Sequence, residues 1–213
     1  MTTVEIVSVS ADRVGGIVLC GGQSTRMGRP KLSLPFGDET MLGRVVRIVG
    51  ETVSPLVVVA AAGQELPPLP PKTIVARDEV ESQGPLAGLV AGLAALSARA
   101  DAAYVSSCDV PLLKAAFVRA MIEALGTHDM AIPLEREFYH PLAAVYRTTL
   151  EPRARRLLAA GRLRTQFLVQ ECDARVVEAS DLRSADPALD SLRNINTPEE
   201  YEAALRAAGI RPG

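Results

Sequence analysis

Short apolar runs rich in β-branched residues alternate with helical segments along most of the chain, and this alternation constrains the fold more than any other feature. Runs this short, closed by glycine or polar residues, are typical of buried parallel strands, whereas the segments between them place apolar residues at helical spacing. We expect strands at residues 16–20, 56–60, 72–76, 102–106 and 175–177, further extended segments at 129–133 and 141–146, and helices at 41–51, 86–96, 114–125, 148–160 and 197–208. The alternation predicts an α/β fold, with a doubly wound, mostly parallel Rossmann-like sheet and helices on both faces.

The length and composition fit a single domain. The chain has 213 residues, of which 48% are hydrophobic, so a large core can form. Residues 1–13 mix polar and apolar types, and we expect them to be a leader ahead of a single domain at 14–213. The formal net charge of −2 disfavours nucleic acid as a partner, because such binding depends on clustered Lys and Arg.

Several absences in the sequence bear on where the protein works. No stretch reaches the roughly 18 apolar residues that a membrane helix needs, and no signal-peptide pattern precedes the first strand. The cysteines, Cys20, Cys108 and Cys172, include no CxxC pair, which argues against a disulfide framework or a structural zinc site. These features favour a cytoplasmic protein with no membrane partner.

A glycine-rich segment at 19–31 directly follows the first expected strand. Gly21 and Gly22 allow backbone N–H groups to turn toward an anion without an intervening side chain. Arg26 and Lys31 add positive charge to the same segment. The spacing matches neither the P-loop nor the dinucleotide fingerprint. The residue types alone therefore indicate either an anion-binding loop or a glycine-rich turn with solvated charges.

Two carboxylates follow expected strands. Asp109 comes soon after the strand at 102–106, where a carboxylate can bind a hard cation such as Mg²⁺ together with phosphate oxygens and water. The alternative is that Asp109 caps the helix that follows Pro111. Asp78 lies at the end of the third expected strand. It either contacts a nucleotide or is a loop carboxylate without a ligand.

The glycine-rich segment carries the pattern GGxSxRMGxxK, which resembles the signature of the nucleotidyltransferases that activate sugars and cofactors. In that family the loop holds the triphosphate, and its lysine neutralises phosphate charge. The resemblance assigns nucleotide binding to Leu19, Cys20, Gly21, Gly22, Arg26 and Lys31. The family pattern CDxP, matched at residues 108–111, implies that Asp109 binds Mg²⁺ and also contacts the nucleotide.

Three further motifs narrow the resemblance: GPLAG at 84–88, HPLxAVY at 140–146 and NINTPEE at 194–200. In this order they resemble the molybdenum cofactor guanylyltransferases over about residues 16–205. The resemblance implies a nucleotide-binding half at about 14–112 and an acceptor-binding half at about 113–213. It places Asp78, Gly84 and Pro85 against the nucleotide, and His140, Asn194 and Asn196 on the acceptor side.

The residues of NINTPEE also permit a structural interpretation. Thr197, Pro198 and Glu200 fit the capping box of a helix start. That interpretation leaves Asn194 and Asn196 unexplained, and the alternation of an extended segment predicts that their side chains point the same way.

The function implied by the resemblance is transfer of GMP from GTP to molybdopterin-bound molybdenum cofactor, giving the guanine dinucleotide cofactor and pyrophosphate. The attacking phosphate is already ionised, so catalysis needs alignment and charge neutralisation by Arg26, Lys31 and Asp109 rather than a general base. GTP and molybdopterin are the implied partners, with transient contacts to proteins that supply the cofactor or to molybdoenzymes. The alternatives are a cytidylyltransferase that uses CTP, a sugar-phosphate nucleotidyltransferase and a non-catalytic nucleotide sensor.

Overall fold

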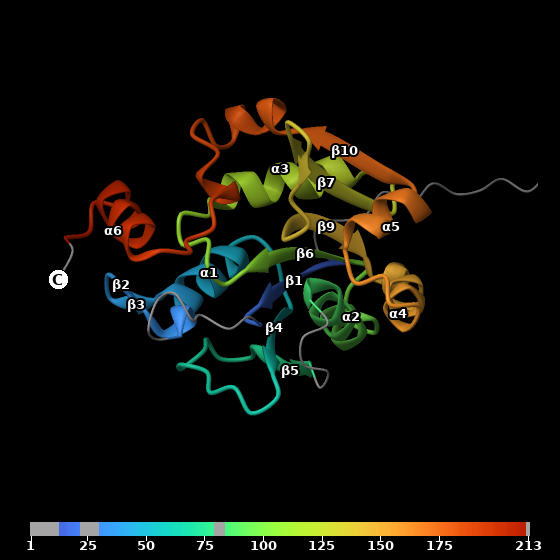
Figure 1. Ribbon diagram of the computed structural model, residues 1–213, viewed down its shortest axis with the longest axis horizontal. Helices are drawn as coiled ribbons and strands as arrows, with labels where there is room; N and C mark the ends of the chain where they lie inside the picture. Colours follow the sequence, from blue (N-terminus) through green and yellow to red (C-terminus); the bar gives the residue numbers. More distant parts are fainter. Residues whose placement is uncertain (1–12, 22–29, 79–83, 212–213) are drawn as a thin grey trace, which may run out of the picture.

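One mixed sheet runs through the described part of the chain, which comprises residues 13–21, 30–78 and 84–211 of the computed structural model (Figure 1). The strand order is β10-β7-β9-β6-β1-β4-β5, and β8 pairs with β7. The strands are β1 (Val14–Leu19), β4 (Leu56–Ala61), β5 (Ile74–Asp78), β6 (Ala102–Ser107), β7 (Met130–Glu135), β8 (Phe138–Tyr139), β9 (Ala143–Arg147) and β10 (Ala174–Glu178). Strands β6, β1, β4 and β5 are mutually parallel, as is β10 with β7, whereas β9 runs antiparallel to both β6 and β7. The prediction of a mostly parallel α/β sheet is confirmed.

Helices cover both faces of this sheet, which explains why every residue of β1 and β6 is buried. The helices are α1 (Met41–Gly50), α2 (Gly84–Leu96), α3 (Ala115–Leu125), α4 (Glu151–Ala159), α5 (Gln166–Glu171) and α6 (Pro198–Ala207). Side chains of α1 and α3 form one core with the sheet, and those of α2, α4 and α5 form a second core with the other face. The prediction of helices on both faces is therefore also confirmed.

Helix α2 lies unusually close to β1 because of a glycine. A Cβ added at Gly92 would lie 2.7 Å from Cγ2 of Ile17, a separation that real Cβ contacts do not show. The missing side chain lets the helix approach the strand closely. The close approach seats the helix that begins at Gly84 beside the strand that ends at Leu19.

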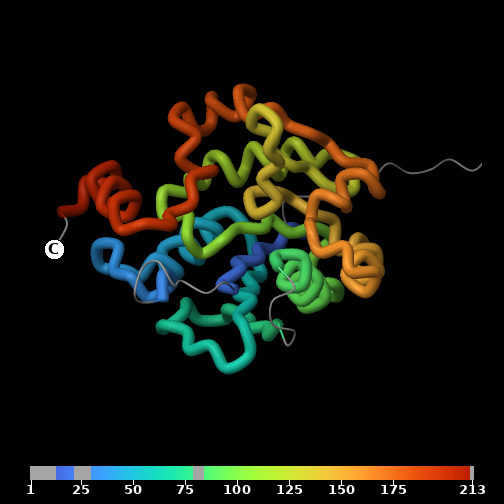
Figure 2. Tube along the Cα trace, viewed as in Figure 1, coloured from blue at the N-terminus to red at the C-terminus, as the bar shows by residue number. Residues whose placement is uncertain are grey.

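A third, smaller core joins segments far apart in the sequence. Helix α6 lies beside the antiparallel pair β2 (Pro35–Phe36) and β3 (Glu39–Thr40), and Figures 1 and 2 show the red C-terminal segment next to the blue one. Phe36, Ile195 and Leu205 are buried in this core, and the ring of Tyr201 meets that of Phe36 edge-on at 6.5 Å. The C-terminal segment is thus packed against the segment that follows the glycine-rich loop.

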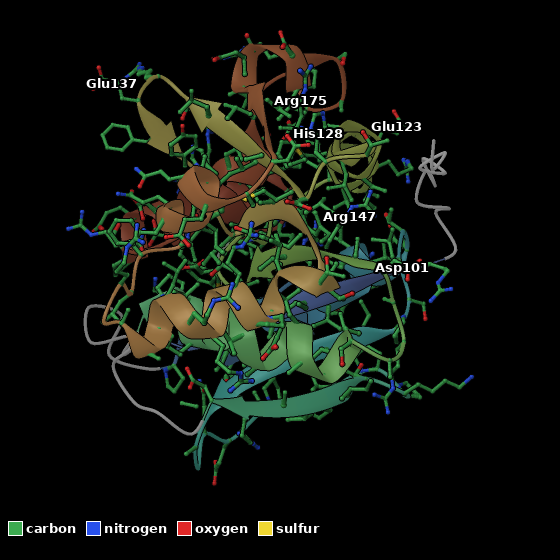
Figure 3. The ribbon with its side chains drawn as sticks, turned by 90° about the vertical axis from the view of Figure 1, so that its right-hand side faces the viewer. Asp101, Glu123, His128, Glu137, Arg147 and Arg175 are labelled. Atoms are coloured by element: carbon green, nitrogen blue, oxygen red, sulfur yellow. The ribbon has the colours of Figure 1, made fainter. Side chains whose placement is uncertain are left out.

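The amino ends of β6 and β7 and the carboxyl end of β9 form the edge of the sheet opposite the candidate site. Arg147 ends β9, and its Nε donates to the backbone carbonyl of His128 at 2.8 Å. Both residues are labelled in Figure 3. Its guanidinium also donates to the carbonyl of Gly126 at 2.9 Å. Asp101, just before β6, forms an ion pair with Arg13 at 2.8 Å. These contacts join neighbouring segments at this end of the sheet.

Several boundaries differ from the sequence expectations. The third strand is Ile74–Asp78 rather than 72–76, so Asp78 belongs to the strand itself. The expected helix at 148–160 divides into a 3₁₀ turn at Thr148–Leu150 and α4, whose first turn contains Pro152. Proline lacks an N–H and is favoured in a first helical turn, which explains where the α-helix begins.

Other elements were not predicted. They are β2, β3, β8, α5 and the 3₁₀ segments η3 (Lys31–Ser33), η5 (Ala179–Ser184) and η6 (Asp190–Leu192). The expected leader at 1–13 lies outside the described residues except for Arg13. Within the described ranges, no helix has the length and apolar character needed to cross a membrane.

Candidate nucleotide and metal site

The candidate site lies where β1 and β6 end side by side. Leu19 and Ser107 are partners in the parallel register, so the residues that follow them leave the sheet at the same edge. The N–H of Cys108 donates to the carbonyl of Leu19 at 3.0 Å, which extends the pairing beyond β6. Ligands of α/β sheets bind at the carboxyl ends of parallel strands, so this edge is where a binding site is expected.

The side chain of Asp109 is the centre of a hydrogen-bonded cluster at this edge. Its Oδ1 accepts from Ser107 Oγ at 2.5 Å and from Asn194 Nδ2 at 3.0 Å. Its Oδ2 lies 3.3 Å from Nζ of Lys31. The side chains of Asp109 and Lys31 are only 13% and 16% exposed, so water screens their mutual attraction less than it would on an open surface.

Lys31 has a second recorded partner in the same cluster. Its Nζ donates to Oδ1 of Asn196 at 2.8 Å. Lys31 begins the short 3₁₀ segment η3, and the next residue, Leu32, is 3% exposed and packed in the core. The buried leucine fixes the backbone from which the lysine side chain extends toward Asp109.

The asparagine segment reaches this cluster because of the residue between the two asparagines. Ile195 is 3% exposed in the third core, and its N–H donates to the backbone carbonyl of Asp109 at 2.9 Å. The side chains of Asn194 and Asn196 then both reach the ion pair of Asp109 and Lys31, as the alternation of an extended segment predicts. The structure thus brings two residues expected on the acceptor side into contact with two expected on the donor side.

The capping box predicted at the start of α6 is confirmed. The N–H of Glu200 donates to Oγ1 of Thr197 at 3.2 Å, and Oε2 of Glu200 accepts from the N–H of Thr197 at 3.1 Å. The same Oε2 also accepts from the N–H of Asn196 at 2.6 Å. The helix start therefore holds the backbone of the asparagine segment as well as its own first turn.

The ends of β4 and β5 form the neighbouring part of the site. The N–H of Ala62 donates to the carbonyl of Asp78 at 3.2 Å, which ties the loop after β4 to the end of β5. Gln64 accepts from the N–H of Ala61 at 3.0 Å and donates to the carbonyl of Cys20 at 3.1 Å. Arg77 donates to the carbonyls of Ala61 and Gln64. These contacts fix the backbone where the glycine-rich loop begins.

Some of the remaining candidate nucleotide-binding residues lie within the described part of the chain. Gly84 has a φ of +70°, a conformation that L-residues rarely adopt, and it begins α2 with an exposed Pro85 in its first turn. Gly21 is exposed at the end of β1, whereas Leu19 and Cys20 are buried. Gly22 and Arg26 lie outside the described residues.

His140 lies between β8 and β9, and β9 starts opposite the end of β6. Its side chain is 23% exposed, and its Nε2 is 3.8 Å from Glu135 Oε2 without a hydrogen-bond partner within the described ranges. Burial lowers the pKa of His140, an effect that the nearby Glu135 carboxylate partly offsets. The imidazole is therefore mainly neutral at neutral pH.

The free thiols of Cys20 and Cys108 are neighbours, although 88 positions separate them in the sequence. Both are buried, at 3% and 8% exposure, at the ends of β1 and β6. A hydrogen bond with Cys108, together with burial, raises the pKa of the Cys20 thiol. Both side chains therefore pack beneath the site, and the thiol of Cys20 stays protonated at neutral pH.

The donor set at Asp109 fits a hard cation that shares its coordination with substrate. Among the described residues, no group of three His, Cys, Asp or Glu side chains could hold a metal ion. A single carboxylate is sufficient for Mg²⁺, which usually keeps several waters and binds substrate phosphates. A structural zinc site would need about four protein ligands. The chemistry of Asp109 therefore fits a divalent cation of this kind.

The α/β sheet places Asp109 just beyond the end of β6 and pairs it with Lys31 of η3, at the edge where such sheets bind ligands, and this arrangement is typical of nucleotide-binding transferases. The chain belongs to the MobA-like NTP transferase domain family, whose model matches residues 16–176. It is a nucleotidyltransferase.

Individual relatives agree with this family over nearly the whole chain. The chain is 40% identical to the "Probable molybdenum cofactor guanylyltransferase" of Mycobacterium ulcerans, over 94% of each chain. It is 35% identical to the "Molybdenum cofactor guanylyltransferase" of Desulfosudis oleivorans, over 93% of this chain and 99% of the relative. The crystal structure of "Molybdopterin-guanine dinucleotide biosynthesis protein A" from Archaeoglobus fulgidus has the same fold, with a TM-score of 0.74 and 20% identity over 92% of this chain and 98% of that one.

Sequence reasoning missed several residues that hold parts of the site in place. Ser107, Gln64 and Arg77 were not candidates, although each holds a backbone or side chain of the site. Ser107 gave only a weak signal, since it lies two residues before Asp109 but the chain turns between them at Cys108.

Proposed function

We propose that this nucleotidyltransferase transfers GMP from GTP to molybdopterin-bound molybdenum cofactor, forming the guanine dinucleotide cofactor and releasing pyrophosphate. The observation that carries the proposal is the ion pair of Lys31, in η3, with Asp109, just beyond the end of β6. The names of the relatives support the choice of guanine nucleotide and pterin acceptor. We further propose that the protein works in the cytoplasm as one domain at 14–213.

The donor half in this proposal is about residues 14–112. The exposed backbone at Gly21 and the loop that continues through Gly22 and Arg26 bind the triphosphate, beside Leu19 and Cys20. Asp78, Gly84 and Pro85 contact the nucleoside from the ends of β5 and the start of α2. Mg²⁺ at Asp109 would supply positive charge to the phosphates when bound.

The chain's own residues contribute alignment and charge to the proposed transfer. Lys31 and Arg26 neutralise the pyrophosphate as it leaves, and the loop amides hold the triphosphate in line with the attacking phosphate. The attacking phosphate is already ionised, so no side chain has to remove a proton. The lowered pKa of His140 is consistent with this mechanism, because a neutral imidazole adds no positive charge on the acceptor side.

The acceptor half in this proposal is about residues 113–213. His140, Asn194 and Asn196 belong to it, and the two asparagines contact Asp109 and Lys31. The acceptor would therefore arrive next to the charged pair rather than at a separate surface. Proteins that supply the cofactor, or molybdoenzymes that take the product, would meet this half transiently.

The decisive experiment measures pyrophosphate release with purified protein, molybdopterin cofactor and Mg²⁺, with GTP in one series and CTP in the other. We expect release with GTP and formation of the guanine dinucleotide product by mass spectrometry. Release with CTP instead would identify a cytidylyltransferase. Inertness with both nucleotides would overturn the pterin acceptor and leave only the broader family.

The substitution Asp109→Asn tests the role of the carboxylate while it keeps the side-chain shape. We expect transfer to fall at least about a hundredfold, because the charge that holds the cation is gone. Circular dichroism and thermal unfolding check that the fold survives. Wild-type turnover of this variant at limiting Mg²⁺ would contradict the assignment.

A further inference from the structure

The carboxylate of Asp109 is held in one orientation by donors from separate segments. Ser107 belongs to β6, Asn194 to the segment before α6, and Lys31 to η3. Ser107 Oγ and Asn194 Nδ2 both donate to Oδ1, at 2.5 and 3.0 Å, and Lys31 Nζ lies 3.3 Å from Oδ2. The two oxygens of the carboxylate therefore have different surroundings.

The difference determines which oxygen remains open to a cation. A carboxylate has about four lone-pair sites, two on each oxygen. The two donors at Oδ1 occupy both of its sites, whereas Oδ2 is contacted only by Lys31 among the described residues. Oδ2 thus has a lone pair that no donor of the described residues occupies.

We propose that Ser107 and Asn194 are positioning residues that orient Asp109 so that Oδ2 binds the divalent cation. The inference deepens the proposed function, since it takes Asp109 as the metal-binding residue, but it does not depend on which acceptor the enzyme uses. In this role both donors act on the cation through the carboxylate of Asp109.

The chemistry of the two donors suits this role. A serine hydroxyl and an asparagine amide donate hydrogen bonds without carrying charge, so they orient the carboxylate without repelling a dication. A lysine at the same position would compete with the cation. Lys31 does lie at Oδ2, but it has Asn196 as an alternative partner at 2.8 Å, so it can leave Oδ2 without losing every contact.

The placement of the two donors makes the orientation rigid. Ser107 is the last residue of β6 and is 9% exposed, so its backbone is held by the sheet. Asn194 is next to Ile195, which is buried and donates its N–H to the backbone carbonyl of Asp109. One donor therefore comes from the central sheet and the other from the C-terminal segment, and the two meet at a single oxygen.

The test is metal binding to the GTP-loaded protein, measured with Mn²⁺ by electron paramagnetic resonance in the absence of acceptor. The variants are Ser107→Ala, Ser107→Thr and Asn194→Ala. Ser106→Ala is the matched control, because Ser106 is the adjacent buried serine of β6 and its Oγ donates to a backbone carbonyl instead. The Mg²⁺ dependence of transfer is measured alongside.

We expect Ser107→Ala and Asn194→Ala each to raise the dissociation constant for Mn²⁺ about tenfold, which is typical when a hydrogen-bond partner of a metal ligand is removed. Ser107→Thr should restore most of the affinity, because it returns the hydroxyl. Ser106→Ala should bind Mn²⁺ as the wild-type protein does. The Mg²⁺ concentration for half-maximal transfer should rise in the same order as the dissociation constants.

Two results would overturn the inference. The first is that Ser107→Ala binds Mn²⁺ as tightly as Ser106→Ala does. The second is that Asn194→Ala binds Mn²⁺ as tightly as the wild-type protein does. If Ser107→Ala does not fold, the result for Asn194→Ala alone tests the inference. Because Mn²⁺ binding is measured without acceptor, failure of the transfer assay with molybdopterin would count against the proposed function and not against this inference.

Discussion

At the scale of single residues, two buried tyrosines provide a matched pair for the energetics of the core. Tyr104 on β6 and Tyr146 on β9 are both fully buried, on adjacent strands. Tyr146 donates its hydroxyl to the carbonyl of Pro141 at 2.8 Å, whereas the hydroxyl of Tyr104 has no partner within the described residues. A buried polar group without a partner costs stability.

We therefore predict opposite effects of the same substitution. Tyr104→Phe should leave the free energy of unfolding unchanged or raise it by about 1 kcal/mol, because an unpaired hydroxyl is removed. Tyr146→Phe should lower it by about 1 kcal/mol, because a hydrogen bond is lost and the Pro141 carbonyl is left without its donor. Urea unfolding of the three proteins measures both changes, and equal destabilisation by the two substitutions would contradict the argument.

Residues of the site were predictable where chemistry and local pattern coincide. Lys31 and Asp109 were candidates because they lie in the motifs GGxSxRMGxxK and CDxP, and the structure brings the two together. Ser107 did not stand out, because a serine at the end of a strand is ordinary in composition and its role depends on which oxygen of Asp109 it meets. The adjacency of Cys20 and Cys108 was equally hidden, since it follows from strand order rather than from spacing in the sequence.

At the scale of elements, the start of α6 couples helix capping to the site. Glu200 Oε2 accepts from the N–H groups of Asn196 and Thr197, so the capping carboxylate also holds the residue that contacts Lys31. We predict that Glu200→Ala lowers the free energy of unfolding by about 1 kcal/mol and raises KM for GTP several-fold. Denaturant unfolding and steady-state kinetics give the two values.

Glu202→Ala is the control for this prediction. Glu202 is on the same helix and exposed, and its ion pair with Arg206 is 3.5 Å long, so its removal should change stability by less than about 0.5 kcal/mol. KM for GTP should stay at the wild-type value in this variant. A rise in KM of the same size in both variants would show that the helix as a whole, and not its capping carboxylate, supports the site.

The type of most long elements followed from the sequence, but pairing partners did not. The strands at β1, β4 and β6 and the helices at α1, α2 and α3 were predicted from runs and spacing that are local properties. The direction of β9 was not, because an antiparallel strand between β6 and β7 is fixed by the path of the chain and not by its own residues. The pair β2 and β3 was missed for a related reason, since each strand is only two residues long.

At the scale of the whole molecule, an ion pair ties the segment before Asn194 to the start of α3. The side chain of Asp186 is fully buried and accepts from Lys114 Nζ at 2.6 Å and from the N–H of Ser191 at 2.7 Å, whereas Lys114, the residue just before α3, is 39% exposed. The segment held in this way leads directly into Asn194. Its attachment therefore affects both global stability and the placement of the asparagine segment.

The pH dependence of unfolding should report this attachment. Burial alone would raise the pKa of Asp186, but hydrogen bonds from Lys114 and Ser191 outweigh it and lower that pKa. A carboxyl whose pKa is lower in the folded state stabilises the fold above its unfolded pKa of about 4 and loses that contribution as the pH falls through the folded value. The hydrogen bond to Asp186 raises the pKa of Lys114, so its contribution is full below about pH 10 and is lost as the pH rises further.

We predict that Asp186→Asn is less stable than the wild-type protein at neutral pH and that the difference shrinks as the pH falls below about 4, because the carboxyl is then protonated in the unfolded chain and, at lower pH still, in the folded protein too. Lys114→Gln removes the other charge and should weaken the same acid dependence, since Asp186 loses its main hydrogen-bond donor. Urea unfolding of the three proteins at a series of pH values from 3 to 7 measures the effect. A stability difference between wild type and Asp186→Asn that stays constant over this range would show that this ion pair does not tie the segment before Asn194 to α3.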